Sequence, residues 1–195
     1  ALAEMAHEEG LPIHLDGARA WNAITALGVS LKDLCEPFDS VSLCLSKGLA
    51  APVGTVLVGS KDFITKVHRY RKLLGGGMRQ AGVIAAAGLV AVREMLGRLA
   101  EDHQRARRLA NKLVEIPGVH VNLDSVQTNM VYFNVDRELM SAPNLAKAMA
   151  EQGVKCNALG PATIRLVVHY HIDDADVDAA VNIIANCLRR DAVSA

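Results

Sequence analysis

Net charge, long apolar runs and paired cysteines are all missing from this sequence. Its 21 basic residues equal its 21 acidic residues, so no net field attracts nucleic acid or an anionic membrane. Its longest apolar stretch, residues 81–92, is shorter than the roughly 20 residues that cross a bilayer, and it predicts a buried helix. These absences argue against a nucleic-acid or membrane partner and favour a small neutral or zwitterionic ligand.

The cysteines form no metal-binding or disulfide pattern. They contain no CxxC pair and no clustered histidine, and we expect four buried, free thiols: Cys35, Cys44, Cys156 and Cys187. Free thiols are typical of a reducing compartment, so the sequence predicts a cytoplasmic protein. Residues 1–9 lack an initiating Met and a targeting leader and have the pattern of a helix end, so we expect the chain to begin within a fold. A preceding mitochondrial leader is the alternative to the cytoplasm.

The first part of the chain alternates between short apolar runs and helical patterns, which is typical of an α/β sheet. Three strands and three helices are expected there: strands at 11–16, 39–45 and 53–59, and helices at 18–27, 61–74 and from 79 onward. Only seven residues, among them Gly48 and Pro52, separate the second strand from the third, which predicts a tight hairpin-like turn around Lys47. Open α/β sheets bind ligands at the carboxyl ends of their strands.

The pattern changes near residue 117. A break near 96–98 precedes a charged amphipathic helix at 98–115, which Pro117 and Gly118 end. Beyond it lie further expected elements: strands at 119–121, 129–135 and 163–169, and helices at 143–152 and 173–190. The sequence therefore predicts two domains, 1–116 with the connecting helix and a small α+β domain at 117–195.

Two ionisable residues stand at the ends of the first two expected strands. Lys47 would be partly desolvated there, which favours a neutral amine able to form a Schiff base with an aldehyde cofactor. Asp16, on the preceding strand, would keep a proton on the ring nitrogen of such a cofactor. Taken singly, Lys47 also fits a solvated surface lysine and Asp16 a simple Asp-Gly turn. The pair carries the prediction.

Three arginines lie where the chain changes from one pattern to the next. Arg19 follows Asp16, Arg79 follows the glycines at 75–77, and Arg165 lies inside an apolar strand. The planar guanidinium binds carboxylate and phosphate bidentately, and backbone amides at a helix start also bind phosphate. The alternatives are an exposed helix start for Arg79, an outward strand position for Arg165, and a flexible linker for the glycines.

Four segments together resemble the L-threonine aldolases, in the same order and at the same spacing. They are residues 15–19 (LDGAR), 46–49 (SKGL) with 52–54 (PVG), 75–80 (GGGMRQ) and 164–167 (IRLV). The similarity runs over nearly the whole chain, and four segments in register are more specific than one lysine. The resemblance implies an α/β, aspartate-aminotransferase-like fold of the fold-type I transferases that depend on pyridoxal 5′-phosphate (PLP). The chain would hold part of the large domain and the small C-terminal α+β domain.

The resemblance also implies roles for single residues. Lys47 would be the catalytic residue and the covalent anchor of PLP, and Asp16 would pair with the pyridine nitrogen. Arg19 would lie beside the cofactor and the substrate carboxylate, and Arg165 would bind that carboxylate. Arg79 would reach the cofactor phosphate of a neighbouring subunit. No metal is implied.

The implied activity is retro-aldol cleavage of L-threonine or L-allo-threonine to glycine and acetaldehyde. The partners would be a small β-hydroxy-α-amino acid and further copies of the chain in a dimer or tetramer. Two alternatives stay open: another PLP lyase of the same fold that eliminates at the β carbon, and a non-catalytic fragment that acts only by association. The N-terminal half that such enzymes carry has no counterpart in this chain, which predicts open sheet edges and exposed apolar surface.

Overall fold

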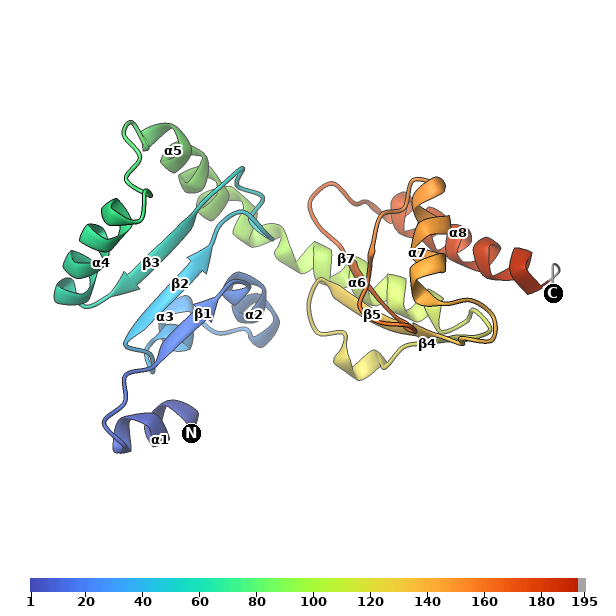
Figure 1. Ribbon diagram of the computed structural model, residues 1–195, viewed down its shortest axis with the longest axis horizontal. Helices are drawn as coiled ribbons and strands as arrows, with labels where there is room; N and C mark the ends of the chain where they lie inside the picture. Colours follow the sequence, from blue (N-terminus) through green and yellow to red (C-terminus); the bar gives the residue numbers. More distant parts are fainter. Residues whose placement is uncertain (193–195) are drawn as a thin grey trace. The chain divides into compact units, whose positions relative to one another are not determined.

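The chain folds as two compact units, Ala1–Leu99 and Ala100–Ala195, each with its own sheet. This computed structural model describes the backbone of residues 1–192 and the side chains of residues 1–189 (Figure 1). The expected connecting helix is α6 (Leu99–Leu113), and it packs with the second unit. The structure thus groups this helix differently from the predicted domains 1–116 and 117–195, which stay a prediction.

The first unit contains three strands with helices before, between and after them. In chain order its elements are α1 (Leu2–Glu8), β1 (His14–Gly17), α2 (Ala20–Leu27), α3 (Leu31–Cys35), β2 (Ser40–Cys44), β3 (Thr55–Gly59), α4 (Lys61–Leu73) and α5 (Gly82–Val90). A π-helical turn, Ala91–Met95, and a 3₁₀ turn, Leu96–Arg98, then interrupt the helix where the sequence predicts a break. The short helix α3 was not predicted.

The sheet of the first unit has the order β1-β2-β3. β1 runs parallel to β2, and β2 runs antiparallel to β3, so the expected hairpin around Lys47 is confirmed. Residues of α2 pack against one face of β2, through Trp21 and Ile24 against Val41 and Leu43. Since side chains alternate between the two faces, Asp16 and its cross-strand neighbour Ser42 lie on the opposite face.

The second unit is an α+β arrangement, as predicted. Its elements after α6 are β4 (Val119–His120), a 3₁₀ turn (Leu123–Ser125), β5 (Met130–Val135), α7 (Ala142–Glu151), β6 (Asn157–Ala158), β7 (Thr163–Val167) and α8 (Asp174–Ala192). The four strands are antiparallel and have the order β4-β5-β7-β6. The two-residue strand β6 was not predicted, because so short a segment has no periodicity.

All three helices of the second unit contribute to one core on one face of its sheet. Side chains from α6, α7 and α8 join those of β5 and β7, among them Leu113, Leu145, Ile184, Phe133 and Ile164. The core-facing residues alternate with outward ones along β7, where Ile164 and Leu166 are buried. Arg165 therefore lies on the face that the helices leave uncovered.

Several expectations about burial are wrong for this chain. Of the four thiols expected to be buried, only Cys187 is, and the other three are partly buried. The helix predicted at 81–92 as buried is α5, and its side chains Val83, Leu89 and Val90 are 78%, 54% and 50% exposed. The first strand, expected to be buried, is the edge strand β1, and both His14 and Asp16 are exposed on it. An apolar pattern indicates which side chains favour burial, but no other described residues cover these side chains of α5 and β1.

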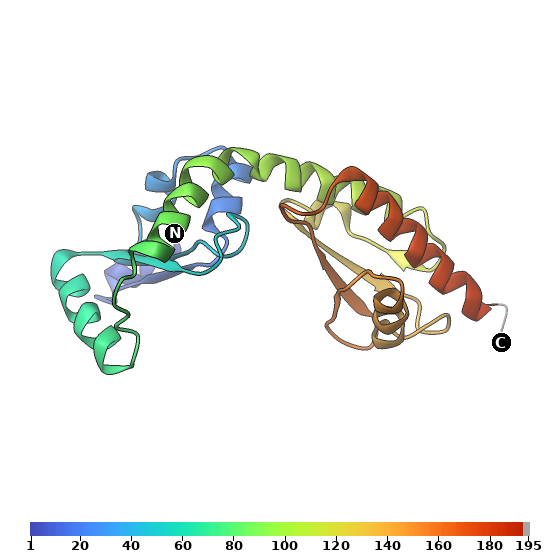
Figure 2. The same ribbon diagram turned by 90° about the horizontal axis from the view of Figure 1, so that it is seen from above.

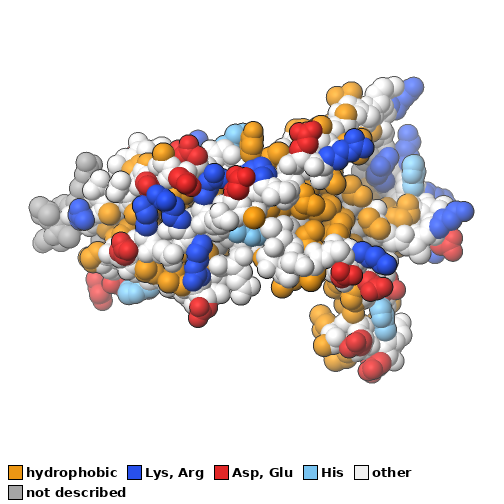
Figure 3. Space-filling view, turned by 180° about the vertical axis from the view of Figure 1, so that it is seen from behind, with side chains coloured by type: hydrophobic (Ala, Val, Ile, Leu, Met, Phe, Trp, Pro, Cys, Tyr) orange, Lys and Arg blue, Asp and Glu red, His pale blue; other side chains and the backbone are white. Residues whose placement is uncertain are grey.

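Apolar side chains remain uncovered over much of the first unit, as expected for a sheet with open edges. Figure 3 shows hydrophobic side chains gathered on this unit. Exposed ones include Val53, Val56, Val58, Leu73, Leu74, Met78, Val83, Leu89 and Val90. Contiguous apolar surface of this kind marks a place where another polypeptide packs.

In the second unit α6 and α8 lie side by side and are joined by ion pairs (Figure 2). Asp178 accepts hydrogen bonds from Arg108 Nη2 at 2.7 Å and from Lys112 Nζ at 2.7 Å. The guanidinium of Arg108, and after it the ammonium of Lys112, holds the pKa of Asp178 below its usual value of 3.8. Because the pKa of Asp178 is lower in the folded than in the unfolded chain, its ion pairs with Arg108 and Lys112 stabilise the folded state fully at a pH above the unfolded pKa. This stabilisation is lost as the pH falls through the folded pKa.

Asp178→Asn should therefore make the stability of the second unit less dependent on pH in acid. The parent loses this contribution below about pH 3.8, whereas the variant lacks it at every pH. Denaturant unfolding at a series of pH values from neutral downward measures the difference. Asp124→Asn, which changes an exposed carboxylate outside these ion pairs, is the control, and parallel pH curves for the parent and Asp178→Asn would contradict the prediction.

Candidate active site

Asp16 lies next to the last residue of β1, and Lys47 follows the carboxyl end of its parallel neighbour β2. In the register of β1 and β2, Asp16 pairs with Ser42 and Gly17 pairs with Leu43. Lys47 lies in the turn that follows Cys44, the last residue of β2. Parallel neighbours end at the same edge of a sheet, so the structure brings the two predicted residues to one edge, where α/β sheets bind ligands.

The backbone around Lys47 is fixed by three hydrogen bonds. Lys47 O accepts from Ala50 N at 2.9 Å, Leu45 O accepts from Ala51 N at 3.0 Å, and Leu45 N donates to Gly54 O at 2.9 Å. Ala50 has a φ of 56°, a left-handed conformation that a non-glycine residue adopts only when its surroundings enforce it. The turn is therefore held in a strained shape.

The side chain of Lys47 is exposed, whereas its neighbours in the turn are anchored. Leu49 is 0% exposed and Leu45 is 7% exposed, so the turn is fastened to the core on both sides of the lysine. The predicted partial desolvation of Lys47 is wrong for this chain, because no described side chain covers the amine. A covering layer would have to come from a ligand or another polypeptide.

Asp16 is held by its own loop and keeps an oxygen available. Its Oδ1 accepts a hydrogen bond from Ala18 N at 3.1 Å, which turns the chain from β1 toward α2. Its side chain is exposed, on the face of the sheet opposite α2. Arg19 is the N-cap residue of α2 and is half-buried. The structure thus places Asp16, Arg19 and the turn of Lys47 within one unit, on β1, at the start of α2 and after β2.

Two residues that sequence reasoning missed connect these elements. Trp21, 7% exposed, donates from Nε1 to Cys44 O at 3.1 Å. Asn22, 2% exposed, lies so close to Gly48 that a Cβ on that glycine would be 2.7 Å from Asn22 Oδ1. The single tryptophan of the sequence, just after the predicted Arg19, was the available signal.

Cys44 completes the polar surroundings of the turn. Its Sγ is 3.5 Å from Ser46 Oγ. Partial burial pushes the pKa of the Cys44 thiol upward, but hydrogen bonds from Ser46 and the charge of Lys47 outweigh it, so this pKa lies below its usual value. The positive charge of Lys47 therefore acts on the end of β2, even though its amine is solvated.

Arg165 lies in the second unit, on β7, between its cross-strand neighbours Tyr132 and Asn157. It is half-buried, and its Nε is buried without a hydrogen-bond partner. A buried guanidinium nitrogen without a hydrogen-bond partner costs free energy. An anionic ligand would supply the missing acceptor, so the position fits an anion-binding site. Arg165 thus has an outward position on the strand, and its binding of an anion stays a prediction.

Arg79 lies apart from these residues along the chain, in the loop between α4 and α5. It is exposed and makes no hydrogen bond or ion pair with the described residues. The next residue, Gln80, has a φ of 51°, in the left-handed region that few non-glycine residues adopt. The guanidinium of Arg79 is therefore available to bind a group from another molecule.

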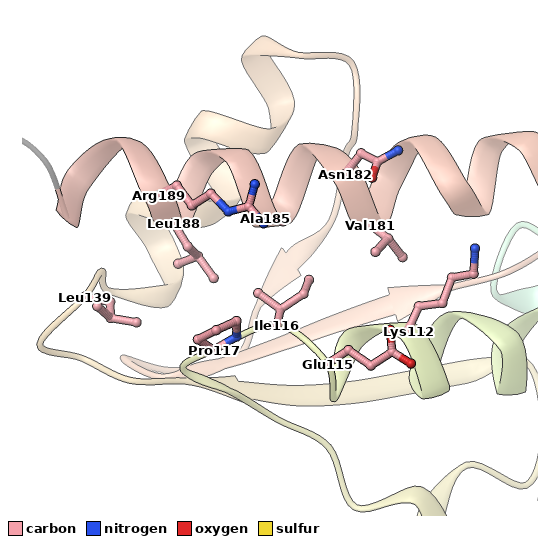
Figure 4. A pocket seen from close by; sticks show the side chains of 10 residues that line it. All are labelled: Lys112, Glu115, Ile116, Pro117, Leu139, Val181, Asn182, Ala185, Leu188 and Arg189. Carbon is pink, nitrogen blue, oxygen red and sulfur yellow. The ribbon is translucent and has the colours of Figure 1, made fainter.

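A cavity of about 450 Å³ lies elsewhere in the second unit, between the end of α6 and α8 (Figure 4). Its lining consists of Lys112, Glu115, Ile116, Pro117, Leu139, Val181, Asn182, Ala185, Leu188 and Arg189. None of the five predicted site residues is among them, so this cavity is not the predicted site. Over the described part of the chain, no group of three His, Cys, Asp or Glu residues has the arrangement of a metal site, and no helix is sufficiently long and apolar to cross a membrane.

Comparison with known sequences identifies a family. The sequence model of the family described as beta-eliminating lyase matches residues 1–136, more than half of the chain. A probable low-specificity L-threonine aldolase 2 of Arabidopsis thaliana is 46% identical over 178 residues, which cover 91% of this chain and 50% of that protein. The low specificity L-threonine aldolase of Escherichia coli K12 is 41% identical over 169 residues, covering 87% of this chain and 49% of that protein. The chain thus spans about half the length of these relatives.

Solved structures show the same fold. A putative L-allo-threonine aldolase of Listeria monocytogenes matches with a TM-score of 0.78 and 22% identity, over 97% of this chain and 54% of that one. The ornithine delta-aminotransferase of Plasmodium falciparum matches with a TM-score of 0.61 and 15% identity, over 97% and 50%. The predicted aspartate-aminotransferase-like fold is therefore confirmed.

Gly48→Ala should destabilise the first unit. The added Cβ would lie 2.7 Å from Asn22 Oδ1 and 3.1 Å from Leu99 Cδ2, and both neighbours are buried, so neither moves away freely. We expect a loss of about 1–3 kcal/mol in the free energy of unfolding, measured by chemical denaturation. Gly82→Ala, where a Cβ meets nothing within 4 Å, is the matched control and should be neutral or stabilising. Equal effects of the two changes would show that the contact of Gly48 with Asn22 is not tight.

Proposed function

Since this chain belongs to the beta-eliminating lyase family, we propose that it supplies the cofactor lysine and the carboxylate-binding arginine of a PLP-dependent threonine aldolase. The reaction is cleavage of L-threonine or L-allo-threonine to glycine and acetaldehyde. The observation that carries the proposal is the pair Asp16 and Lys47 at one sheet edge, in a chain 46% identical to a relative named as such an aldolase. Because the chain spans about half of that relative, the activity of the whole protein belongs to the proposal.

The residues at the sheet edge fit PLP by their chemistry. The exposed amine of Lys47 is free to react with the aldehyde carbon of PLP, and the turn that carries it is anchored by buried Leu45 and Leu49. The carboxylate of Asp16 has an oxygen left over for the protonated ring nitrogen. When bound, PLP supplies an electron sink for the carbon whose bond is broken.

Arg165 and Arg19 would then hold the amino-acid substrate. The unpaired Nε of Arg165 is a donor that a carboxylate satisfies, and the guanidinium fork binds it through two parallel hydrogen bonds. Arg19, at the start of α2 beside Asp16, adds a second positive charge for the substrate carboxylate. Fixing the carboxylate fixes which bond at Cα is aligned for cleavage, and such positioning contributes several kcal/mol to catalysis.

Further copies of the chain are the proposed partners, in a dimer or tetramer. The uncovered apolar side chains of β3, α4 and α5 support association. Arg79 is exposed on the loop between α4 and α5, and we propose that it reaches the cofactor phosphate bound by a neighbouring subunit. We also propose a cytoplasmic location, which the four free cysteines support.

Association without catalysis is the second candidate function. The exposed apolar surface of the first unit favours it. The two functions differ in whether the chain binds PLP, because association alone does not require the amine of Lys47. Stoichiometric covalent uptake of PLP supports the lyase, and its absence supports association alone.

Lys47→Ala should abolish covalent uptake of PLP. The purified chain is incubated with PLP, reduced with borohydride, freed of unbound cofactor and weighed by mass spectrometry. We expect one phosphopyridoxyl group on the parent and none on the variant, because the reacting amine is removed. Lys32→Ala, which removes an exposed lysine of α3, is the control and should label like the parent. Equal labelling of both variants would assign the anchor to another lysine.

Arg165→Lys should weaken substrate binding to the PLP-loaded chain. A lysine keeps the charge but loses the planar fork, so the apparent dissociation constant for L-allo-threonine should rise roughly tenfold to a hundredfold. Titration of the cofactor absorbance with the amino acid measures it. Arg137→Lys changes an exposed arginine of the same unit and should leave the constant unchanged. An unchanged constant for Arg165→Lys would mean that this residue does not contact the carboxylate.

A further inference from the structure

Trp21 joins two parts of the site that are distant in the sequence. It belongs to α2, which begins immediately after the loop of Asp16 and Arg19. Its indole Nε1 donates to the carbonyl oxygen of Cys44, at a distance of 3.1 Å. Cys44 is the last residue of β2, directly before the turn that carries Lys47.

That carbonyl belongs to the last residue of β2. The next residue, Leu45, keeps the register of β2 with β3, because its N donates to Gly54 O at 2.9 Å, whereas its O accepts from Ala51 N at 3.0 Å within the turn. The turn that carries Lys47 therefore begins within one residue of the carbonyl that Trp21 contacts. An indole that is 7% exposed has little freedom, so its N–H holds that carbonyl in one orientation.

Neighbouring contacts reinforce the same role for α2. Asn22, the next residue on the helix, is packed so closely against Gly48 that a Cβ at position 48 would lie 2.7 Å from Asn22 Oδ1. Two consecutive residues of α2 therefore contact the backbone on both sides of the exposed Lys47. The amine itself is free, while the backbone that carries it is fixed by this helix.

We propose that Trp21 is a positioning residue for Lys47: its indole N–H fixes the last carbonyl of β2 and thereby sets where the lysine amine stands relative to Asp16. This inference rests on the proposed role of Lys47 as the cofactor anchor. Trp21 acts through the backbone and contacts neither the cofactor nor the substrate in this account. Asp16 lies directly before the loop that leads into α2, and Trp21 belongs to α2. The hydrogen bond from Trp21 to Cys44 O therefore fixes the end of β2, and with it the turn of Lys47, relative to Asp16.

The test removes the N–H donor and keeps the ring. Trp21→Phe is the first variant. Biosynthetic replacement of Trp21 by benzothienylalanine, which has the size of tryptophan but no N–H, is the second, and it is site-specific because the sequence has a single tryptophan. Thr25→Val is the matched control: it removes one hydrogen bond from the same helix, that of Thr25 Oγ1 to Trp21 O at 2.9 Å, and leaves β2 untouched.

Two measurements are made on each protein. The first is amide hydrogen exchange of residues 45–51 without cofactor. The second is borohydride-trapped labelling in excess PLP, at which solvent-exposed lysines also react, and it is expressed as the ratio of label on Lys47 to label on the exposed Lys32 of the same molecule. This ratio cancels general unfolding, which changes both lysines, and a thermal melt records stability separately.

We expect faster exchange of residues 45–51 in both Trp21 variants but not in Thr25→Val. The labelling ratio should fall by about tenfold, the factor expected from loss of one hydrogen bond. Unchanged exchange in the benzothienylalanine protein overturns the proposal, whatever the labelling shows. If the parent labels Lys47 in preference to Lys32, an unchanged labelling ratio in the Trp21 variants also overturns it. A parent without preference for Lys47 contradicts the proposed function, and the exchange data alone then decide whether Trp21 fixes the turn.

Discussion

The parallel pairing of β1 with β2 is the constraint on which the candidate site depends. Parallel strands that lie side by side finish at the same edge of the sheet, so the residues at and beyond their carboxyl ends gather at that edge. Here those residues are Asp16, next to the last residue of β1, and the turn of Lys47 after β2. The antiparallel strand β3 then closes the hairpin and fixes how far the lysine turn extends.

A sheet edge alone does not determine where a flexible lysine stands, and α2 supplies what the strands leave open. The helix begins at the loop of Asp16 and Arg19 and packs across β2, where Trp21 reaches the carbonyl of Cys44. Gly48 has no side chain to keep Asn22 away, so the helix approaches the turn directly. The local backbone is therefore rigid around an amine that is itself solvated.

The apolar side chains of the first unit and the side chain of Lys47 are exposed for the same reason, because no other described residues cover them. A three-stranded sheet has two edges, and the apolar side chains of β3 and α5 lie uncovered beside them. The relatives that this chain matches are about twice as long. The second unit, by contrast, buries a continuous core under three helices, and its site residue Arg165 lies on the face that those helices leave open.

Much of this architecture follows from the sequence by itself. Strands and helices repeat with periods of two and 3.6 residues, which neighbouring residues reveal, and the motifs around Asp16, Lys47, Arg79 and Arg165 indicated the family. The tertiary structure alone decided that the indole of Trp21 bonds to Cys44, that Gly48 meets Asn22, that α5 is uncovered and that the Nε of Arg165 is buried without a partner. Periodicity describes which side of an element avoids water, but hydrogen bonds and burial depend on which atoms of distant segments come within about 3 Å of each other, and only the packed chain sets those distances.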